Sequence, residues 1–164
     1  MASRGLEQII NQAYPLAKQQ RCLIHISRNL ASKVKWADRA VILEQFKTIY
    51  HAENLEIAVQ ALEDFISEWK PKYRKFMESL ENTDNLLTFY QFPYQIWHSL
   101  YSTNLIESLN KEIKRQTKKK VLFPNEEAME RYLVTLFEDY NFKQSQRIHK
   151  GFGQCSDTLE SLFD

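Results

Sequence analysis

A row of polar side chains follows one face of the segment that runs from Leu105 to Lys118. Residues three and four positions apart in a helix lie on the same face. The members of the row are Glu107, Asn110, Lys111, Lys114 and Lys118. A carboxylate can hold Mg²⁺, and lysines one and two turns further on can bind the phosphates of a strand laid along the helix. This pattern is therefore suited to phosphodiester chemistry.

The same residues also fit an ordinary helix start. Asn104 is a suitable N-cap, and Glu107 would then stand where a capping box places Glu or Gln. An early acid and late bases also complement the helix dipole. On the opposite side, Leu105, Ile106, Leu109 and Ile113 are expected to pack on a core. Spacing alone leaves both interpretations of the polar row open.

Further cations lie beside the row. Residues 111–120 carry six Lys or Arg and one acid, so Arg115 is a further candidate for phosphate contact. The run 118–120 lies where the helix ends, and its cations would also neutralise the terminal carbonyls. The net charge of +1 points to no partner, which makes this local clustering the informative feature.

Cys22 and His25 are spaced like half of a zinc site. A structural zinc needs four ligands. The other cysteine and histidines of the chain are Cys155, His51, His98 and His149. Because these four form no second close pair, the sequence does not favour zinc.

Residues 89–101 are rich in aromatic side chains. Such rings can stack on unpaired bases, but they more often fill a core. The core interpretation is favoured, with Trp97 and Tyr101 expected to brace the helix that follows.

Helices are expected to position all of these residues. Apolar side chains recur at helical spacing after Asp38 and after Asn54, with a break at Pro71, and again from residue 126 to Tyr140. Three glycines and four prolines are too few for most all-β folds. The expected fold is therefore mainly α.

The short apolar run Arg21–Ile26 is either a buried strand or the lead-in to a helix for which Ser27 is the expected N-cap. At most one or two short strands are expected, near residues 20–26. The tail after residue 150 is expected to fray.

Composition places the chain among ordinary globular proteins. Its 164 residues are 43% hydrophobic and 26% charged, which argues against wholesale disorder. Two widely separated cysteines do not make a disulfide framework and indicate a reducing compartment. No apolar run approaches the length needed to cross a bilayer, and the first ten residues lack the apolar core of a signal peptide. A cytoplasmic protein without a membrane partner is expected.

Two ordered motifs resemble those of a known family. The segment Tyr101–Ala128, YSTNLIESLNKEIKRQTKKKVLFPNEEA, resembles the final signature of mutator-type bacterial insertion-sequence transposases. The segment Gln20–Asn29, QRCLIHISRN, is similar to the earlier Cys-x-x-His segment of that family. Gly5–Pro15 is similar to the helix that follows the family's second catalytic aspartate. The likeness extends to Tyr140, although residues 36–94 match only in helical character.

The resemblance implies a DDE transposase with a ribonuclease-H-like core and a helical insertion. In such enzymes two aspartates and one glutamate hold two Mg²⁺ ions, which activate the attacking oxygen and stabilise the leaving one. By motif match, Glu107 is the third catalytic acid and a metal ligand. Lys114 matches the basic residue of the family motif. Cys22 would then be a packed thiol, and His25 would orient the neighbouring active site.

The chain departs from the family pattern in its acids. Before Asp38 it has no aspartate, and its only acid there is Glu7. One of three metal ligands is therefore present, and one carboxylate does not hold two divalent cations. The expectation is the C-terminal part of a truncated ribonuclease-H-like α/β domain. This part alone is expected to be inactive and to bind no metal tightly, although the parent enzyme would use Mg²⁺.

Four regions are expected. They are a remnant of the catalytic core (1–35), a helical insertion (36–100), the glutamate-bearing and final core helices (101–142) and a flexible tail (143–164). The candidate DNA-contacting residues are Asn110, Lys111, Lys114, Arg115 and Lys118. The candidate supporting residues are Cys22, His25, Asn104 and Trp97.

The expected function of the parent is Mg²⁺-dependent cleavage and transfer of DNA at insertion-sequence ends. The alternative is a non-catalytic helical module that binds DNA or a partner. The expected partners are DNA, a second copy of the chain and a full-length transposase.

Overall fold

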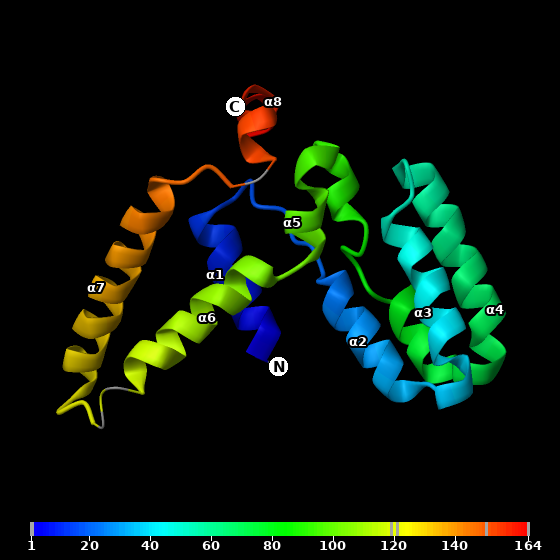
Figure 1. Cartoon of the computed structure of the whole chain (residues 1–164), viewed down its shortest axis with the longest axis horizontal. Helices are drawn as coiled ribbons and strands as arrows, with labels where there is room; N and C mark the ends of the chain where they lie inside the picture. The colour runs from blue at the N-terminus through cyan, green and yellow to red at the C-terminus, as the bar shows by residue number, and fades with distance from the viewer. Residues whose placement is uncertain (1, 119, 121, 150, 164) are drawn as a thin grey trace.

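The computed structural model of the chain describes residues 2–118, 120, 122–149 and 151–163, and these are almost entirely helical (Figure 1). The longer helices are α1 (Ala2–Ala13), α2 (Leu23–Lys33), α3 (Trp36–Tyr50), α4 (Leu55–Glu81), α6 (Asn104–Thr117) and α7 (Glu126–Ser145). The shorter ones are η1 (Thr88–Gln91), η2 (Tyr94–Ile96), α5 (Trp97–Tyr101), η3 (Phe152–Gln154) and α8 (Ser156–Phe163). The described residues contain no strand, and the mainly α prediction is confirmed. None of the described helices is both long and apolar enough to span a bilayer.

The run Arg21–Ile26, expected to be either a strand or the lead-in to a helix, leads into α2, which begins at Leu23. Cys22 is the N-cap of this helix, and its sulfur accepts a hydrogen bond from the backbone N–H of His25. The prediction of Ser27 as N-cap is therefore wrong, because the helix has already begun four residues earlier. Residues 20–26 contain no strand.

The two following helices start close to where the apolar pattern places them. Asn54 caps α4 as predicted, with its side-chain oxygen 2.9 Å from the backbone nitrogen of Ile57. Helix α3 begins at Trp36, two residues before Asp38. Asp38 does not cap it, because its carboxylate accepts hydrogen bonds from Lys72 and Tyr73 of α4 instead.

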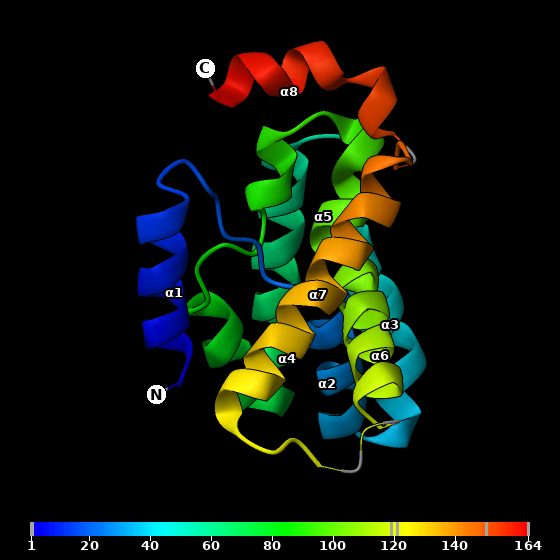
Figure 2. The same ribbon diagram turned by 90° about the vertical axis from the view of Figure 1, so that its left-hand side faces the viewer.

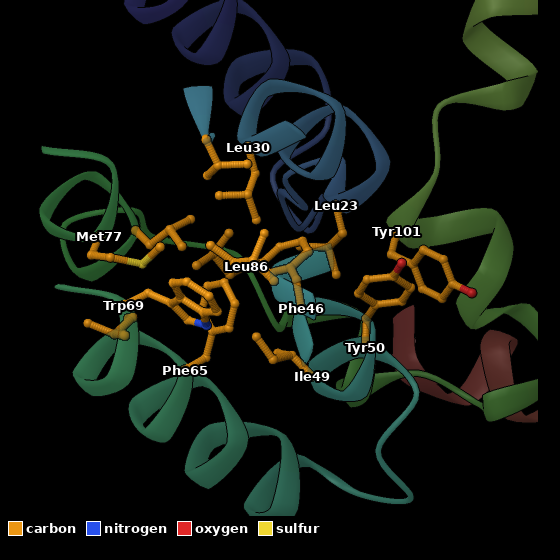
Figure 3. Packing of buried hydrophobic residues seen from close by; sticks show 14 of the residues in the cluster. Leu23, Leu30, Phe46, Ile49, Tyr50, Phe65, Trp69, Met77, Leu86 and Tyr101 are labelled. Atoms are coloured by element: carbon orange, nitrogen blue, oxygen red, sulfur yellow. The ribbon is translucent and has the colours of Figure 1, made fainter. Parts of the chain in front are cut away.

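Helices α2, α3 and α4 pack around one hydrophobic core (Figure 3). Leu30 of α2, Ile42 of α3 and Met77 of α4 have no exposed surface. The rings of Phe46 and Phe65 join α3 to α4, with centroids 5.5 Å apart. Each fully buried apolar side chain contributes roughly 1.5–3 kcal/mol to folding. This burial holds α2 firmly against the other two helices.

The aromatic segment that precedes α6 extends this core as predicted, except that Tyr94 is exposed. Phe89 is fully buried, and its ring lies 4.2–5.5 Å from the rings of Tyr90, Trp97 and Tyr101. The hydroxyl of Tyr90 donates to the backbone oxygen of Ile49 at 2.8 Å. The chain therefore enters α6 from a rigid, packed base.

Helices α6 and α7 lie to one side of α2, α3 and α4 (Figure 1), and Figure 2 looks onto that side. Helix α7 has no buried residue among its 20 positions. Ile106 of α6 is 61% exposed, whereas Leu109 and Ile113 are partly covered. The expectation that Ile106 packs on a core is therefore wrong within this chain.

The tail, for which flexibility is expected, is mostly helical in its described residues. It contains η3 and α8, and Cys155 between them is buried. Gly151 has φ +91°, and a Cβ there would lie 2.2 Å from the backbone oxygen of Gln95. This close approach, which needs glycine, joins the tail to η2.

Candidate functional site

Glu107 lies in the first turn of α6, and its carboxylate meets side chains of α2. Its Oε1 atom is 3.2 Å from Nε2 of His25 and 3.4 Å from Nη1 of Arg28. The hydroxyl of Thr103, just before α6, donates to the same oxygen at 3.3 Å. Two segments about 80 residues apart in the sequence therefore converge on one carboxylate oxygen.

The capping-box interpretation of α6 is wrong. The N-cap is Thr103, whose side chain makes no capping hydrogen bond, and Asn104 is already helical. Glu107 is therefore the fourth helical residue. Its carboxylate faces α2 rather than folding back onto the backbone at the start of its own helix.

Thr103 connects Cys22 and His25 to the carboxylate. Its hydroxyl oxygen is 3.5 Å from Sγ of Cys22 and 3.2 Å from Nδ1 of His25. Both ring nitrogens of His25 are thus engaged, one with Thr103 and the other with Glu107. A polar partner on the second ring nitrogen fixes the orientation and tautomer of an imidazole.

The regular geometry of α2 aligns its contribution. Cys22, His25 and Arg28 follow one another at intervals of three residues, which places them on one side of the helix. Leu23 and Leu30 on the other side are buried in the core. The core therefore holds the polar side of α2 toward α6.

The network is open to solvent. The side chain of Glu107 is 34% exposed, and those of His25 and Arg28 are 53% and 61% exposed. Solvent-exposed ion pairs contribute only about 0.2–1 kcal/mol each. The contacts therefore orient the carboxylate more than they stabilise the fold, and a ligand can reach it.

The row beyond Glu107 is exposed along α6. Asn110, Lys111, Lys114 and Lys118 all face solvent. Within the described part of the chain, none of the three lysines forms an ion pair. Their charges are therefore available to an anionic ligand.

Arg115 differs from these lysines because it is held by Glu112. Its guanidinium donates to both carboxylate oxygens, at 3.0 and 2.8 Å. Hydrogen bonds from Arg115 and Gln116 lower the pKa of Glu112 to about 2. Lys111 and Arg115 line a cleft of about 600 Å³ between α6 and α7.

Two further predicted supporting residues do not touch the carboxylate. Trp97 packs against Phe89 and donates from Nε1 to the backbone oxygen of Phe92 at 2.7 Å. Asn104 is exposed in the first turn of α6.

Motifs and spacing did not indicate Arg28 or Thr103 as members of the site. For Arg28 a signal existed, because it continues the three-residue spacing of Cys22 and His25. Thr103 lies in the STN tripeptide, where its neighbour Asn104 drew attention as a cap.

The residues around Glu107 do not complete a metal site. Mg²⁺ takes six oxygen ligands, commonly including carboxylates. Glu107 is the one carboxylate here, and its partners are a guanidinium, an imidazole and a hydroxyl. Across residues 2–118, 120, 122–149 and 151–163, no three His, Cys, Asp or Glu side chains are grouped as metal ligands.

Replacing Glu107→Gln should lower the free energy of unfolding by less than about 1 kcal/mol, since it removes only exposed ion pairs. Urea denaturation followed by circular dichroism measures this. Asn125→Ala is the matched control, because Asn125 does cap α7, accepting from the N–H of Ala128 at 2.8 Å. Its loss should cost about 1 kcal/mol. A larger loss for Glu107→Gln than for the control would contradict an orienting role for these contacts.

Three transposases of insertion sequences are similar to the chain. That of IS905 from Lactococcus lactis subsp. lactis (strain IL1403) is 93% identical over 161 residues, which are 98% of this chain and 41% of the relative. That of IS1201 from Lactobacillus helveticus is 38% identical over 148 residues, or 81% and 40%. That of ISRM3 from Rhizobium meliloti (strain 1021) is 30% identical over 138 residues, or 83% and 34%.

The chain thus spans well under half the length of these relatives. Residues 2–145 match the family described as "Transposase, Mutator family". This match covers α1 to α7, and with them both segments that meet at Glu107. The chain therefore belongs to the Mutator family of transposases.

Proposed function

We propose that the chain supplies one catalytic acid and a DNA-holding helix to Mg²⁺-dependent cleavage and transfer of DNA at insertion-sequence ends. The observation that carries this proposal is the convergence of His25, Arg28 and Thr103 on the carboxylate of Glu107. A carboxylate that is oriented by hydrogen-bond donors from a second helix is suited to ligating a metal beside a phosphodiester. The similarity to transposases of insertion sequences supports the reaction class.

Each residue of the network has a separate part in this proposal. Glu107 would hold a metal ion together with acids from outside this network, and bound Mg²⁺ would supply Lewis-acid chemistry there. His25 orients Glu107 and is itself held by Thr103, which Cys22 contacts in turn. Arg28 neutralises the carboxylate. Further carboxylates must come from outside this network.

The basic row then holds the DNA. Lys111, Lys114 and Lys118 continue along α6 from Glu107 and point into solvent. Asn110 adds an amide at the same face. Lysines that meet phosphates release counterions and place the strand in register. Arg115 contributes less in this proposal, since Glu112 already binds its guanidinium.

The four expected regions acquire roles in the same way. Residues 1–35 present α2 to the acid, residues 36–100 form the insertion that holds α2 in place, and residues 101–142 carry the acid and the basic row. The remainder, 143–164, packs back onto η2 through Gly151.

Mg²⁺ should bind this chain only weakly, on a millimolar scale, because Glu107 lacks partner acids in its network. Titration calorimetry measures the affinity, and Glu107→Gln is the control that removes the proposed ligand. The chain should also fail to cleave DNA alone. Micromolar Mg²⁺ affinity that Glu107→Gln abolishes would contradict the assignment of a single acid.

The DNA-holding role is tested by reversing two charges, Lys111→Glu with Lys114→Glu. The affinity for duplex DNA should fall, and the slope of log K against log salt should flatten by about 1.8, since each phosphate contact contributes about 0.9. Fluorescence anisotropy at several salt concentrations gives both quantities.

The matched control reverses Lys47 and Arg131, each paired with an acid of its own helix. If the Lys111 and Lys114 variant behaves like this control, the DNA contact of α6 is elsewhere.

A second candidate function has a specific observation in its favour. Helix α7 buries no residue, and its apolar side chains Val134, Phe137 and Phe142 remain exposed. Exposed apolar surface of this kind marks interaction sites. We propose as the alternative a non-catalytic module that associates with itself or with a full-length transposase.

Sedimentation of the chain mixed with the IS905 transposase tests this alternative. A complex that Val134→Asp with Phe137→Asp abolishes supports it. A chain that stays monomeric in the mixture contradicts it.

A further inference from the structure

A second basic surface lies at the far end of α2 from Cys22. It is a hollow of about 450 Å³ where the end of α2 meets the second half of α4. Its lining residues are Lys33, Lys72, Tyr73, Lys75, Phe76 and Ser79. Three lysines and no acid line it, with two aromatic rings and a hydroxyl between them. We call these six residues the kink pocket.

The kink of α4 shapes this pocket. Pro71 lacks the N–H that would bond one turn back, and Tyr73 departs from helical geometry with φ −129° and ψ 46°. The hydroxyl of Tyr73 accepts from the backbone N–H of Lys35 at 3.0 Å and donates to Asp38. The ring of Tyr73 is therefore held in place by α3.

The charge of the pocket is strongly unbalanced. Asp38 is the acid that contacts it, and Lys72 binds that carboxylate at 2.6 Å. The hydrogen bonds from Lys72 and Tyr73 lower the pKa of Asp38. Lys33 and Lys75 are exposed, and neither forms an ion pair with a described residue. Two cations thus remain for an anion from solution.

Helix α2 extends from His25, which contacts Glu107, to Lys33, which lines the pocket. His25, Asn29 and Ser32 are exposed at intervals of three and four residues, and Lys33 follows. At 1.5 Å per residue, His25 and Lys33 are about 12 Å apart along the helix axis. That is the axial rise of three to four base pairs, at about 3.4 Å each. One stretch of DNA backbone can therefore lie along α2 and reach both.

We propose that the kink pocket binds the phosphodiester backbone of the DNA whose neighbouring phosphates lie at Glu107. This proposal rests on the proposed function, which places DNA at Glu107. It adds a second anchoring surface, where the end of α2 meets α4, rather than on α6. Lys33 and Lys75 contact phosphates, and Lys72 adds to the positive potential while it holds Asp38. A line of phosphates crossing from α6 along α2 fixes the direction of the bound strand.

The test is a double reversal, Lys33→Glu with Lys75→Glu, in the full chain. Lys72 is left unchanged because its ion pair with Asp38 joins α3 to α4. Duplex DNA of random sequence, labelled with a fluorophore, is titrated at several salt concentrations. Affinity should fall at least about tenfold at 0.1 M salt, and the salt slope should flatten by about 1.8. Thermal unfolding of each variant reports whether the fold is kept.

The Lys47 and Arg131 double reversal is again the control, since it changes the net charge by the same amount. If the Lys33 and Lys75 variant keeps its fold and binds DNA like this control, the proposal is overturned. Loss of binding on reversal of Lys111 and Lys114 alone would keep the proposed function and reject the kink pocket. An unmodified chain that binds no DNA would reject both. Inorganic phosphate is also titrated while the backbone amide signals of the pocket are followed by NMR. If these signals shift but the Lys33 and Lys75 reversal leaves DNA affinity unchanged, the pocket binds a free anion and the proposal is overturned.

Discussion

The contact between Glu107 of α6 and the polar side of α2 is the constraint on which the candidate site depends. Side-chain atoms of His25, Arg28 and Thr103 lie 3.2–3.4 Å from one carboxylate oxygen, Oε1 of Glu107. These groups are exposed, so their interactions add little to the stability of the fold. Their effect is geometric, because an imidazole held at both nitrogens leaves the carboxylate one preferred orientation.

The stiffness needed for this arrangement comes from the core. Leu30 packs α2 against α3 and α4 in the hydrophobic core. Phe89 and Tyr101 attach the segment that leads into α6 to the same core. The two sides of the site are therefore attached to one packed body. By contrast, α7 adds no buried residue, so its place is less tightly determined by this chain.

Local signals predicted much of the fold. The apolar spacing after Asn54, the cap itself and the helix around Glu107 are consequences of neighbouring residues, and the structure confirms them. The predictions that failed concern side chains with distant partners. Asn104 was expected to cap α6 and Glu107 to complete a capping box. The N-cap is Thr103, and the carboxylate of Glu107 contacts His25 of α2. The tail was expected to fray, yet it contains η3 and α8 and approaches Gln95 closely at Gly151.

The sequence by itself determined the family, the mainly helical fold and the acid with its row of lysines, because motif order, helix periodicity and charge spacing are written along the chain. Only the tertiary structure decided which side chains Cys22 and His25 contact. Their partners Thr103 and Glu107 are about 80 positions away. Folding brings such residues together through the packing of α2 on the core, and no local pattern encodes that distance.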